Sequence, residues 1–297
     1  MPKTSIFFVI QGLYMQSQAL LLASSLRAHL GDEPDLVGYL PLDDARPGPD
    51  AATKAALDGF GVSLQTMEIP AGAWKKPYPH GNKILAAMQD RTADIHVFMD
   101  TDMVCVAPVD FASLASPNAV SVVPEGVPSW GKNSDRWDRA YAHFNLPLPT
   151  DRVRLTRRRR IEFYPYFNAG LVIFNDAYKG QDEGFGKLWF ETAHDFDFNC
   201  AVAKKRPWLD QITLPLTLAR FGIEYRVLSE DYNFSISNRG FEADATPSIL
   251  HYHQYRFGSE WPQIDTELAR MKQALGPETL AKLPAEFEGY WTASQTD

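Results

Sequence analysis

The first hundred residues alternate between two hydrophobic periodicities, one typical of strands and the other typical of helices. Short apolar runs predict strands at 5–10, 36–40, 62–67 and 95–99, and longer stretches predict helices at 15–30, 50–60 and 82–90. Asp50 is a candidate N-cap for the second helix. Strands that alternate regularly with helices are typical of a mostly parallel sheet with helices on both faces, so we expect the α/β class.

The remainder of the chain is less regular. Apolar runs predict strands at 119–123, 169–174, 225–228 and 248–252, and helical patterns predict helices at 134–144, 185–194, 210–221 and 266–275. Ser134 or Asp135 would start the first of these helices, and Pro215 lies inside the third. Prolines and arginines interrupt both periodicities between 144 and 165, so we expect a long loop or an insertion there.

The composition mainly excludes some classes of function. The chain has 29 basic and 37 acidic residues and a formal net charge of −8, which argues against general nucleic-acid binding. Its two cysteines, Cys105 and Cys200, form no CxxC pair, and we expect both to be buried in a protein of a reducing compartment. The chain has no run of about 18 apolar residues. We therefore expect a cytoplasmic protein whose contact with a membrane is at most peripheral.

Two acidic residues follow the strand expected at 95–99. Asp100 and Asp102 are two positions apart, so their side chains point to the same side if the backbone is extended. Open α/β sheets bind ligands at the carboxyl ends of their strands, and paired carboxylates there suit a divalent cation such as Mg²⁺ or Mn²⁺. A turn at the end of a strand, with acids that cap backbone groups, is the alternative interpretation.

Five short stretches become informative when they are read together. They are Gln11-Gly12-Leu13-Tyr14, Asn82-Lys83-Ile84, Phe98-Met99-Asp100-Thr101-Asp102, Tyr166-Phe167-Asn168-Ala169-Gly170 and Trp208-Leu209-Asp210-Gln211. In this order the stretches resemble motifs of glycosyltransferases of the GT-A fold, and most closely those of the glycogenin-like and galactosyltransferase-like family 8. The family's Thr-Asn-Asp before the tyrosine is absent here, and Glu260-Trp261-Pro262 is only loosely similar to its Lys-Pro-Trp.

This resemblance implies a Rossmann-like, mostly parallel central sheet flanked by helices, with an irregular insertion on the acceptor side. It implies one domain over 1–297, with a nucleotide-sugar-binding half at 1–125 and an acceptor-side half at 126–297. The implied metal is Mn²⁺ or Mg²⁺, held by Asp100, Asp102 and a late histidine. His251 fits the family's His-Tyr pair, and His253 is the alternative ligand.

The resemblance also assigns residues to the donor and to the chemistry. Tyr14 would pack on the nucleotide base, and Lys83 would contact the donor sugar and phosphates. The full donor-binding set is Gln11, Tyr14, Lys83, Asp100, Thr101 and Gly170. The residues beside the reactive sugar would be Asn168, Asp210 and Gln211, although Asp210 could instead be only the N-cap of the helix that follows.

The arginine-rich stretch allows several interpretations. Its members are Arg152, Arg154, Arg157, Arg158, Arg159 and Arg160. They could form a solvated or disordered loop, or they could contact an anion such as the donor diphosphate, an acidic acceptor sugar or a lipid head group. Their position just before Asn168 also suggests a flexible lid.

The function implied by the resemblance is transfer of a hexose from a nucleotide diphosphate sugar, with UDP as the nucleotide. The reaction would depend on Mn²⁺ and would retain the anomeric configuration. The acceptor could be a carbohydrate, a lipid-linked sugar or a protein. The alternatives are a sugar-phosphate nucleotidyltransferase, whose glycine-rich basic loop is poorly matched by Gln11-Gly12-Leu13, and a non-catalytic nucleotide-sugar-binding protein.

Overall fold

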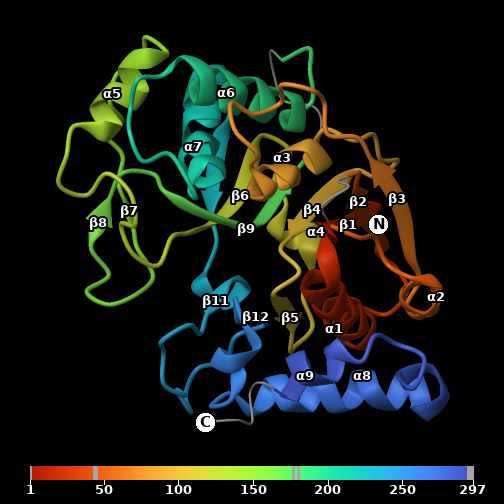
Figure 1. Cartoon of the computed structure of the whole chain (residues 1–297). Helices are drawn as coiled ribbons and strands as arrows, with labels where there is room; N and C mark the ends of the chain where they lie inside the picture. The colour runs from red at the N-terminus through yellow and green to blue at the C-terminus, as the bar shows by residue number, and fades with distance from the viewer. Residues whose placement is uncertain (1, 43–45, 176–177, 179–180, 293–297) are drawn as a thin grey trace. The chain divides into compact units, whose positions relative to one another are not determined.

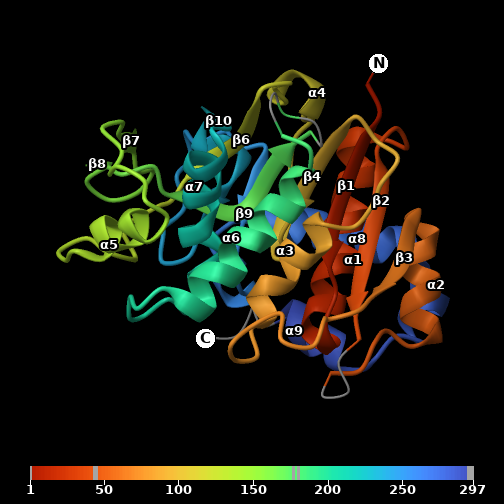
Figure 2. The same cartoon turned by 90° about the horizontal axis from the view of Figure 1, so that it is seen from above.

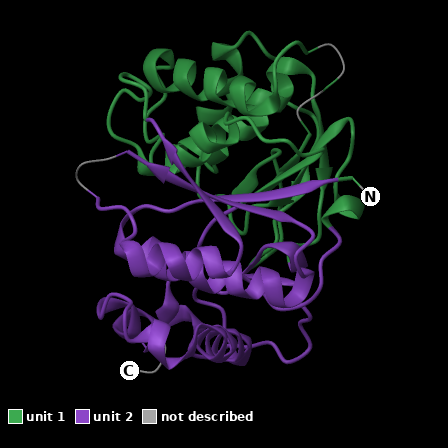
Figure 3. Ribbon diagram, turned by 90° about the vertical axis from the view of Figure 1, so that its right-hand side faces the viewer, with its two compact units in different colours: residues 1–2, 69–98, 111–230 green, residues 3–68, 99–110, 231–297 purple. Residues whose placement is uncertain are grey.

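The computed structural model describes residues 2–42, 46–175, 178 and 181–292. It is an α/β protein with a mostly parallel central sheet flanked by helices, as the alternating periodicities predict (Figure 1). The chain forms two compact units that interleave along the sequence (Figure 3). Unit 1 comprises residues 1–2, 69–98 and 111–230, and unit 2 comprises residues 3–68, 99–110 and 231–297.

Unit 2 begins with three parallel strands, which Figure 2 shows side by side. They are β1 (Thr4–Val9), β2 (Asp35–Pro41) and β3 (Val62–Met67), joined by α1 (Gly12–Leu30) and α2 (Ala51–Gly59). The predicted cap of α2 is confirmed, because Thr53 N donates to Asp50 Oδ1 at 2.7 Å. Gly38 lies in β2, where a Cβ atom would come within 2.9 Å of both the Ile10 and Leu64 side chains. Close packing therefore explains a glycine inside a strand.

The later segments of unit 2 form a second, smaller sheet and two helices. The sheet has the order β11 (Phe234–Ser235), β12 (Ile249–His251) and β5 (Met103–Cys105). The helices α8 (Pro262–Leu280) and α9 (Glu286–Thr292) both contact α1 (Figure 1). The sequence patterns predict β12 and part of α8, but they miss β5, β11 and α9.

Unit 1 has four neighbouring strands in the order β10-β6-β9-β4. They are β4 (Ile95–Met99, whose last residue belongs to unit 2), β6 (Ala119–Pro124), β9 (Phe167–Phe174) and β10 (Glu224–Val227). β10 is parallel to β6, whereas β6 and β9 are antiparallel with a register shift between Val122 and Val123. Each strand was predicted: the bounds of β4 agree, and those of β6, β9 and β10 differ by one or two residues.

The helices of unit 1 are α3 (Asn82–Ala87), α4 (Phe111–Leu114), α5 (Arg136–His143), α6 (Phe185–Asn199) and α7 (Leu209–Phe221). α6 packs against α7 and α3, and α7 also contacts β9 (Figure 1). α7 continues past Pro215 and ends at Gly222, which has a φ of 63° in the left-handed region. The predicted helix at 82–90 stops at Ala87.

The irregular stretch before β9 is a loop, as expected, that contains a short β-hairpin. Its strands are β7 (Val153–Arg154) and β8 (Glu162–Phe163). Strands of two residues carry no readable periodicity, so the sequence could not predict them. Among the described residues, none of the helices is long and apolar enough to span a membrane.

Candidate functional site

Asp100, Thr101 and Asp102 form a turn between β4 and β5. Met103 N donates to Asp100 O at 3.2 Å, the hydrogen bond of a four-residue turn. The prediction that Asp100 and Asp102 share a face of an extended strand is therefore wrong, because β4 ends at Met99. Thr101 is buried, and its hydroxyl donates to Gln18 Oε1 on α1 at 3.3 Å. This contact fixes the turn on unit 2.

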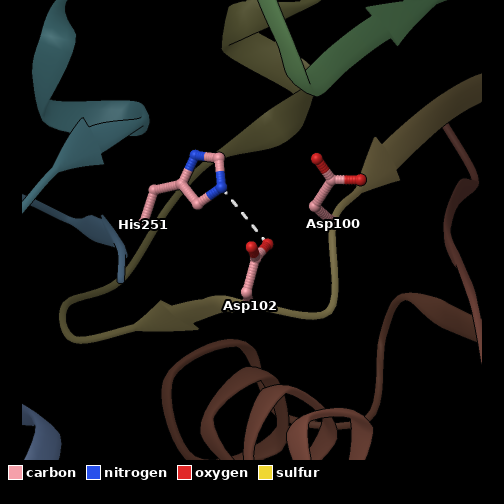
Figure 4. Close-up of side chains that lie close together, drawn as sticks. All are labelled: Asp100, Asp102 and His251. Atoms are coloured by element: carbon pink, nitrogen blue, oxygen red, sulfur yellow. Dashed lines mark ion pairs between the residues drawn. The ribbon is translucent and has the colours of Figure 1, made fainter. Parts of the chain in front are cut away.

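His251 reaches this turn through strand pairing. β12 runs antiparallel to β5, with His251 opposite Met103, and Tyr252 N donates to Asp102 O at 3.0 Å. His251 Nε2 lies 3.2 Å from Asp102 Oδ1 (Figure 4). Backbone contacts on both sides of the turn thus hold the imidazole beside the two carboxylates.

Asn233 orients the His251 ring. Its side-chain Oδ1 lies 2.8 Å from His251 Nδ1, and both residues are buried. An amide oxygen only accepts hydrogen bonds, so Nδ1 carries the proton and donates it. The Nε2 atom that faces the acids then has a lone pair available, which is the tautomer a metal ligand needs.

These three residues fit a divalent cation. One ligand atom from each of Asp100, Asp102 and His251 lies within 4.8 Å of the other two. Two carboxylates and one neutral imidazole are compatible with Mn²⁺, and with Mg²⁺ less well because Mg²⁺ prefers oxygen ligands. The sequence prediction grouped the same three residues, and the structure brings them together. Their role as ligands stays a prediction.

His253, the alternative ligand, lies against His251 but outside this group. Its φ of 60° departs from the extended backbone assumed in the sequence argument. The two imidazole rings stack with centroids 3.9 Å apart, and His253 Nδ1 lies 2.7 Å from Ser237 Oγ. His253 therefore supports the His251 ring from one face.

Tyr14 lies in unit 2 within the first turn of α1, not in a loop before the helix. Its ring is half-buried and makes edge contacts with Tyr255 at 5.7 Å and Tyr290 at 4.9 Å. Its hydroxyl accepts from Tyr255 N at 3.2 Å. Burial raises the pKa of Tyr14, and the nearby Asp102 charge raises it further. Gln11 is buried, and its Oε1 accepts from Arg46 at 2.9 Å.

In unit 1, Lys83 and Asp210 form a buried ion pair. Lys83 Nζ lies 3.2 Å from Asp210 Oδ2, and the side chains are 8% and 6% exposed. The ammonium also donates to Ala169 O at 3.2 Å and lies 5.2 Å from the centre of the Phe98 ring. The N-cap of α7 is Trp208, so the alternative that Asp210 caps this helix is wrong. Asp210 lies inside the first turn of α7, and its carboxylate pairs with the Lys83 ammonium instead.

Tyr78 completes the surroundings of Asp210. Its hydroxyl donates to Asp210 Oδ1 at 2.7 Å. Burial, followed by the Asp210 charge, raises the pKa of Tyr78 well above its ordinary value, so the phenol stays protonated. No sequence motif marks Tyr78, because its importance depends on a contact across 132 positions of the chain.

Asn168 and Gly170 lie on β9 in unit 1. Asn168 Nδ2 donates to Glu125 Oε2 at 3.1 Å, and its Oδ1 accepts from Gly170 N at 2.9 Å. These two contacts fix the orientation of the Asn168 side-chain amide. Gln211 is half-buried in the first turn of α7, one residue after Asp210. Unit 1 therefore brings Lys83 and Asp210 together, and it places Asn168 on the strand that supplies the Ala169 carbonyl.

The arginine-rich hairpin is anchored to the end of β6. Thr156 N donates to Glu125 O at 3.1 Å, and Arg157 N donates to Gly126 O at 3.0 Å. A Cβ atom on Gly126 would lie 2.8 Å from Arg157 Cδ, so this glycine lets the side chain pack closely. Arg160 pairs with Glu230, and Arg152 lies over Tyr164. In the described part of the chain, Arg158 and Arg159 form no ion pair.

Comparison with known proteins places these features in a family. A family model described as the Rhodobacterales glycosyltransferase domain matches residues 6–222. The chain is similar to a crystal structure of the galactosyltransferase LgtC with donor and acceptor sugar analogs. The two are 14% identical, with a TM-score of 0.57 over 97% of this chain and 100% of that one. No curated protein matches.

Two further structures have comparable scores. Mouse xyloside xylosyltransferase 1, in its apo form, is 13% identical with a TM-score of 0.51 over 84% of this chain and 97% of that one. The glycosyltransferase GlyE of Streptococcus pneumoniae TIGR4 is 15% identical with a TM-score of 0.51 over 84% of this chain and 55% of that one. At these identities the likeness concerns the fold, and it confirms the GT-A architecture.

Proposed function

Since the chain belongs to the Rhodobacterales glycosyltransferase domain family, it is a glycosyltransferase, and from this premise we propose its donor and mechanism. It transfers a hexose from a UDP-sugar in a retaining, Mn²⁺-dependent reaction. The observation that carries the proposal is the group formed by Asp100, Asp102 and His251. The donor and acceptor analogs bound to LgtC support a nucleotide-sugar donor for this fold. Family membership argues against a nucleotidyltransferase and against a non-catalytic binding protein.

The residues of unit 2 bind the nucleotide end of the donor in this proposal. Asp100, Asp102 and His251 hold the divalent cation, which neutralises charge on the leaving diphosphate when it is bound. Thr101 fixes the turn that carries both acids. Tyr14 and Gln11 lie beside the nucleobase of the donor. Because Tyr14 already contacts Tyr255 and Tyr290, the base packs against an aromatic group rather than against one ring.

The residues of unit 1 act on the sugar. Asp210, Gln211 and Asn168 orient the hexose and stabilise positive charge that develops at its anomeric carbon, while Gly170 lets the donor approach the backbone of β9. Lys83 has a role besides the contact with the donor sugar and phosphates implied by the resemblance, because its ammonium pairs with Asp210. This ion pair holds that carboxylate in position.

The proposal also covers organisation and location. We regard 1–297 as one GT-A domain with a nucleotide-sugar-binding half at 1–125, because the fold match covers 97% of this chain and all of LgtC. Cys105 and Cys200 are both free and buried, which favours a reducing compartment and hence the cytoplasm.

A screen of nucleotide sugars by thermal shift, with and without Mn²⁺, tests the donor and the metal together. A donor at about 100 times its Kd stabilises the folded state by about 2.7 kcal/mol, so the true donor stands out. We expect UDP-hexoses to raise Tm only when Mn²⁺ is present. Mn²⁺-dependent donor hydrolysis then identifies the sugar.

The variant Asp102→Asn tests the metal group directly. It should lower Mn²⁺-dependent hydrolysis by at least about 100-fold, because one charged ligand is lost at the leaving group. Tm without metal should stay close to that of the unchanged protein. Asp58→Asn, which neutralises an exposed acid on α2, is the matched control and should keep full activity. Full Mn²⁺-dependent activity in Asp102→Asn would show that this group does not hold the ion.

A further inference from the structure

Two basic runs that are far apart in sequence meet in unit 1. Lys75 and Lys76 precede α3, and Lys204, Lys205 and Arg206 lie between α6 and α7. The buried Asp197 carboxylate joins them, because Oδ2 accepts from Lys75 N and from Arg206 Nη2, each at 2.8 Å. Arg206 Nη2 also donates to Lys76 O at 3.2 Å. We call these five cationic residues the basic cluster.

Part of the basic cluster has a structural role. Lys205 Nζ donates to Phe196 O at 2.6 Å and to Asp197 O at 2.9 Å, and Lys75 Nζ donates to Phe198 O at 3.2 Å. These carbonyls belong to the last turn of α6, where cations are favourable. Lys75, Lys205 and Arg206 are therefore accounted for by the end of this helix and by Asp197.

Lys76 and Lys204 are the remaining cations. Both are exposed, and within the ranges that the structure describes neither forms an ion pair. Lys204 has a φ of 59°, a left-handed conformation that a lysine seldom adopts, and its carbonyl accepts from Trp130 Nε1 at 2.8 Å. This bond holds the backbone in place, so the side chain of Lys204 stays close to the cluster.

The cluster has a surplus of positive charge. The Arg206 guanidinium pairs with the Asp197 carboxylate, and Lys75 reaches this carboxylate through its backbone N, so Asp197 offsets one of the five positive charges. Burial lowers the pKa of Lys205, Cys200 and Asp197 raise it, and the nearby Lys75 and Arg206 charges lower it further. In a chain with a formal net charge of −8, such a surplus creates a local attraction for anions.

The cluster is connected to the carboxylate that we place beside the sugar. The Arg206 guanidinium lies 4.5 Å from the centre of the Tyr78 ring, and the Tyr78 hydroxyl donates to Asp210 at 2.7 Å. Arg206 is thus one side chain away from Asp210. An anion bound by the cluster would therefore lie in the same unit as Asp210, the carboxylate that the proposed function places beside the sugar.

We propose that the basic cluster binds an oxyanion on the acceptor, so that the acceptor is a saccharide carrying a carboxylate or a phosphate. Lys76 and Lys204 contact this anion, and the other cations add to the field. This inference rests on the proposed function, because it takes Asp210 to lie beside the transferred sugar. The arginine-rich hairpin is the competing basic surface, since Arg158 and Arg159 are also exposed cations of unit 1.

Calorimetry without donor tests this binding with three probes: methyl glucuronide, glucose 6-phosphate and the neutral methyl glucoside. We expect the unchanged protein to bind at least one anionic probe and not the neutral one, and the stronger of the two anions identifies the group. The double variant Lys76→Glu/Lys204→Glu should weaken that binding by about tenfold or more, since the two charge-assisted contacts together contribute at least about 1.4 kcal/mol.

The double variant Arg158→Glu/Arg159→Glu is the matched control, because it changes the net charge of the same unit by the same amount. It should leave the Kd of the anionic probe within about twofold. Equal weakening in both variants would reduce the effect to general electrostatics, and weakening in the arginine variant alone would move the anion site to the hairpin. Either result overturns the proposal. Circular dichroism and Tm check that both variants are folded.

Two further outcomes also decide the matter. Binding of neither anionic saccharide by the unchanged protein overturns the inference, and so does binding only to vesicles of anionic lipid. Mn²⁺-dependent donor hydrolysis by the unchanged protein reports on the proposed function alone. Hydrolysis without anion binding leaves the proposed function intact and overturns this inference. Anion binding without hydrolysis shows that the basic cluster binds the anion, but it overturns the proposed function and with it the assignment of this anion to the acceptor.

Discussion

Asn233 decides which nitrogen of His251 faces the acids. The sequence could nominate His251, because His251-Tyr252 lies in a predicted strand and fits a family motif. It could not nominate Asn233, whose contact depends on the pairing of β11 with β12. The same holds for Tyr78 and Glu125, which hold Asp210 and Asn168. Residues with a direct role stand in short motifs, whereas the residues that orient them are brought there only by tertiary structure.

Replacing Asn233 therefore tests orientation apart from ligation. Asn233→Ala removes the acceptor of the Nδ1 proton, so the ring can adopt the other tautomer, and Mn²⁺ affinity should fall by about 10- to 100-fold. Titrating Mn²⁺ while following Tm measures this change. Asn233→Asp keeps an acceptor oxygen and should preserve tight binding. Ser237→Ala, which removes the partner of His253, serves as the control. Unchanged affinity in Asn233→Ala would mean that another contact sets the tautomer.

At the scale of elements, long periodic segments were predictable and very short strands were not. β1, β3 and α1 repeat their patterns over six residues or more. β5 has three residues and β11 has two, yet together with β12 they bring His251 to the acids. For this reason the sequence grouped Asp100, Asp102 and His251 correctly but gave the wrong backbone geometry for the two carboxylates, which are joined by a turn.

The contact between α3 and α6 gives a prediction at this scale. A Cβ atom on Gly186 would lie 2.2 Å from Ala87 O, so Gly186→Ala must push the two helices apart. We expect a loss of about 1–3 kcal/mol in the free energy of unfolding, with reduced turnover because α3 carries Lys83. Urea denaturation measures the first effect. Gly289→Ala in α9, where nothing lies within 4 Å, should instead be neutral or stabilising. Equal stability of both variants would contradict this close packing.

For the whole molecule, alkaline pH should be destabilising. Burial raises the pKa of the Cys105 thiol to about 12. In the unfolded chain a thiol ionises near pH 8.5, so above that pH the unfolded state releases a proton that the folded state keeps. The contribution of Cys105 is complete below about pH 8.5 and is lost as the pH rises towards 12, at about 1.4 kcal/mol for each pH unit. The raised pKa values of Tyr78, Tyr166 and Tyr252 steepen this loss above about pH 10.

Urea denaturation at several pH values between 8 and 10.5 measures how steeply the free energy of unfolding falls with pH. Between pH 9 and 10, where tyrosine ionisation contributes little, the free energy of unfolding of Cys105→Ala should fall less steeply with pH than that of the unchanged protein. This expectation holds whatever the stability of the variant at pH 8. Identical slopes would mean that Cys105 ionises freely in the folded state.

The pairing of β12 with β5 has a consequence for how the enzyme is made. About half of the chain separates Asp102 from His251, and the imidazole reaches the carboxylates only after β12 has paired with β5. On the ribosome the first half of the protein emerges with both acids but without the histidine. The nascent chain therefore has only two of the three proposed ligands, and the group of three residues forms only when the C-terminal segment has been synthesised and has folded back.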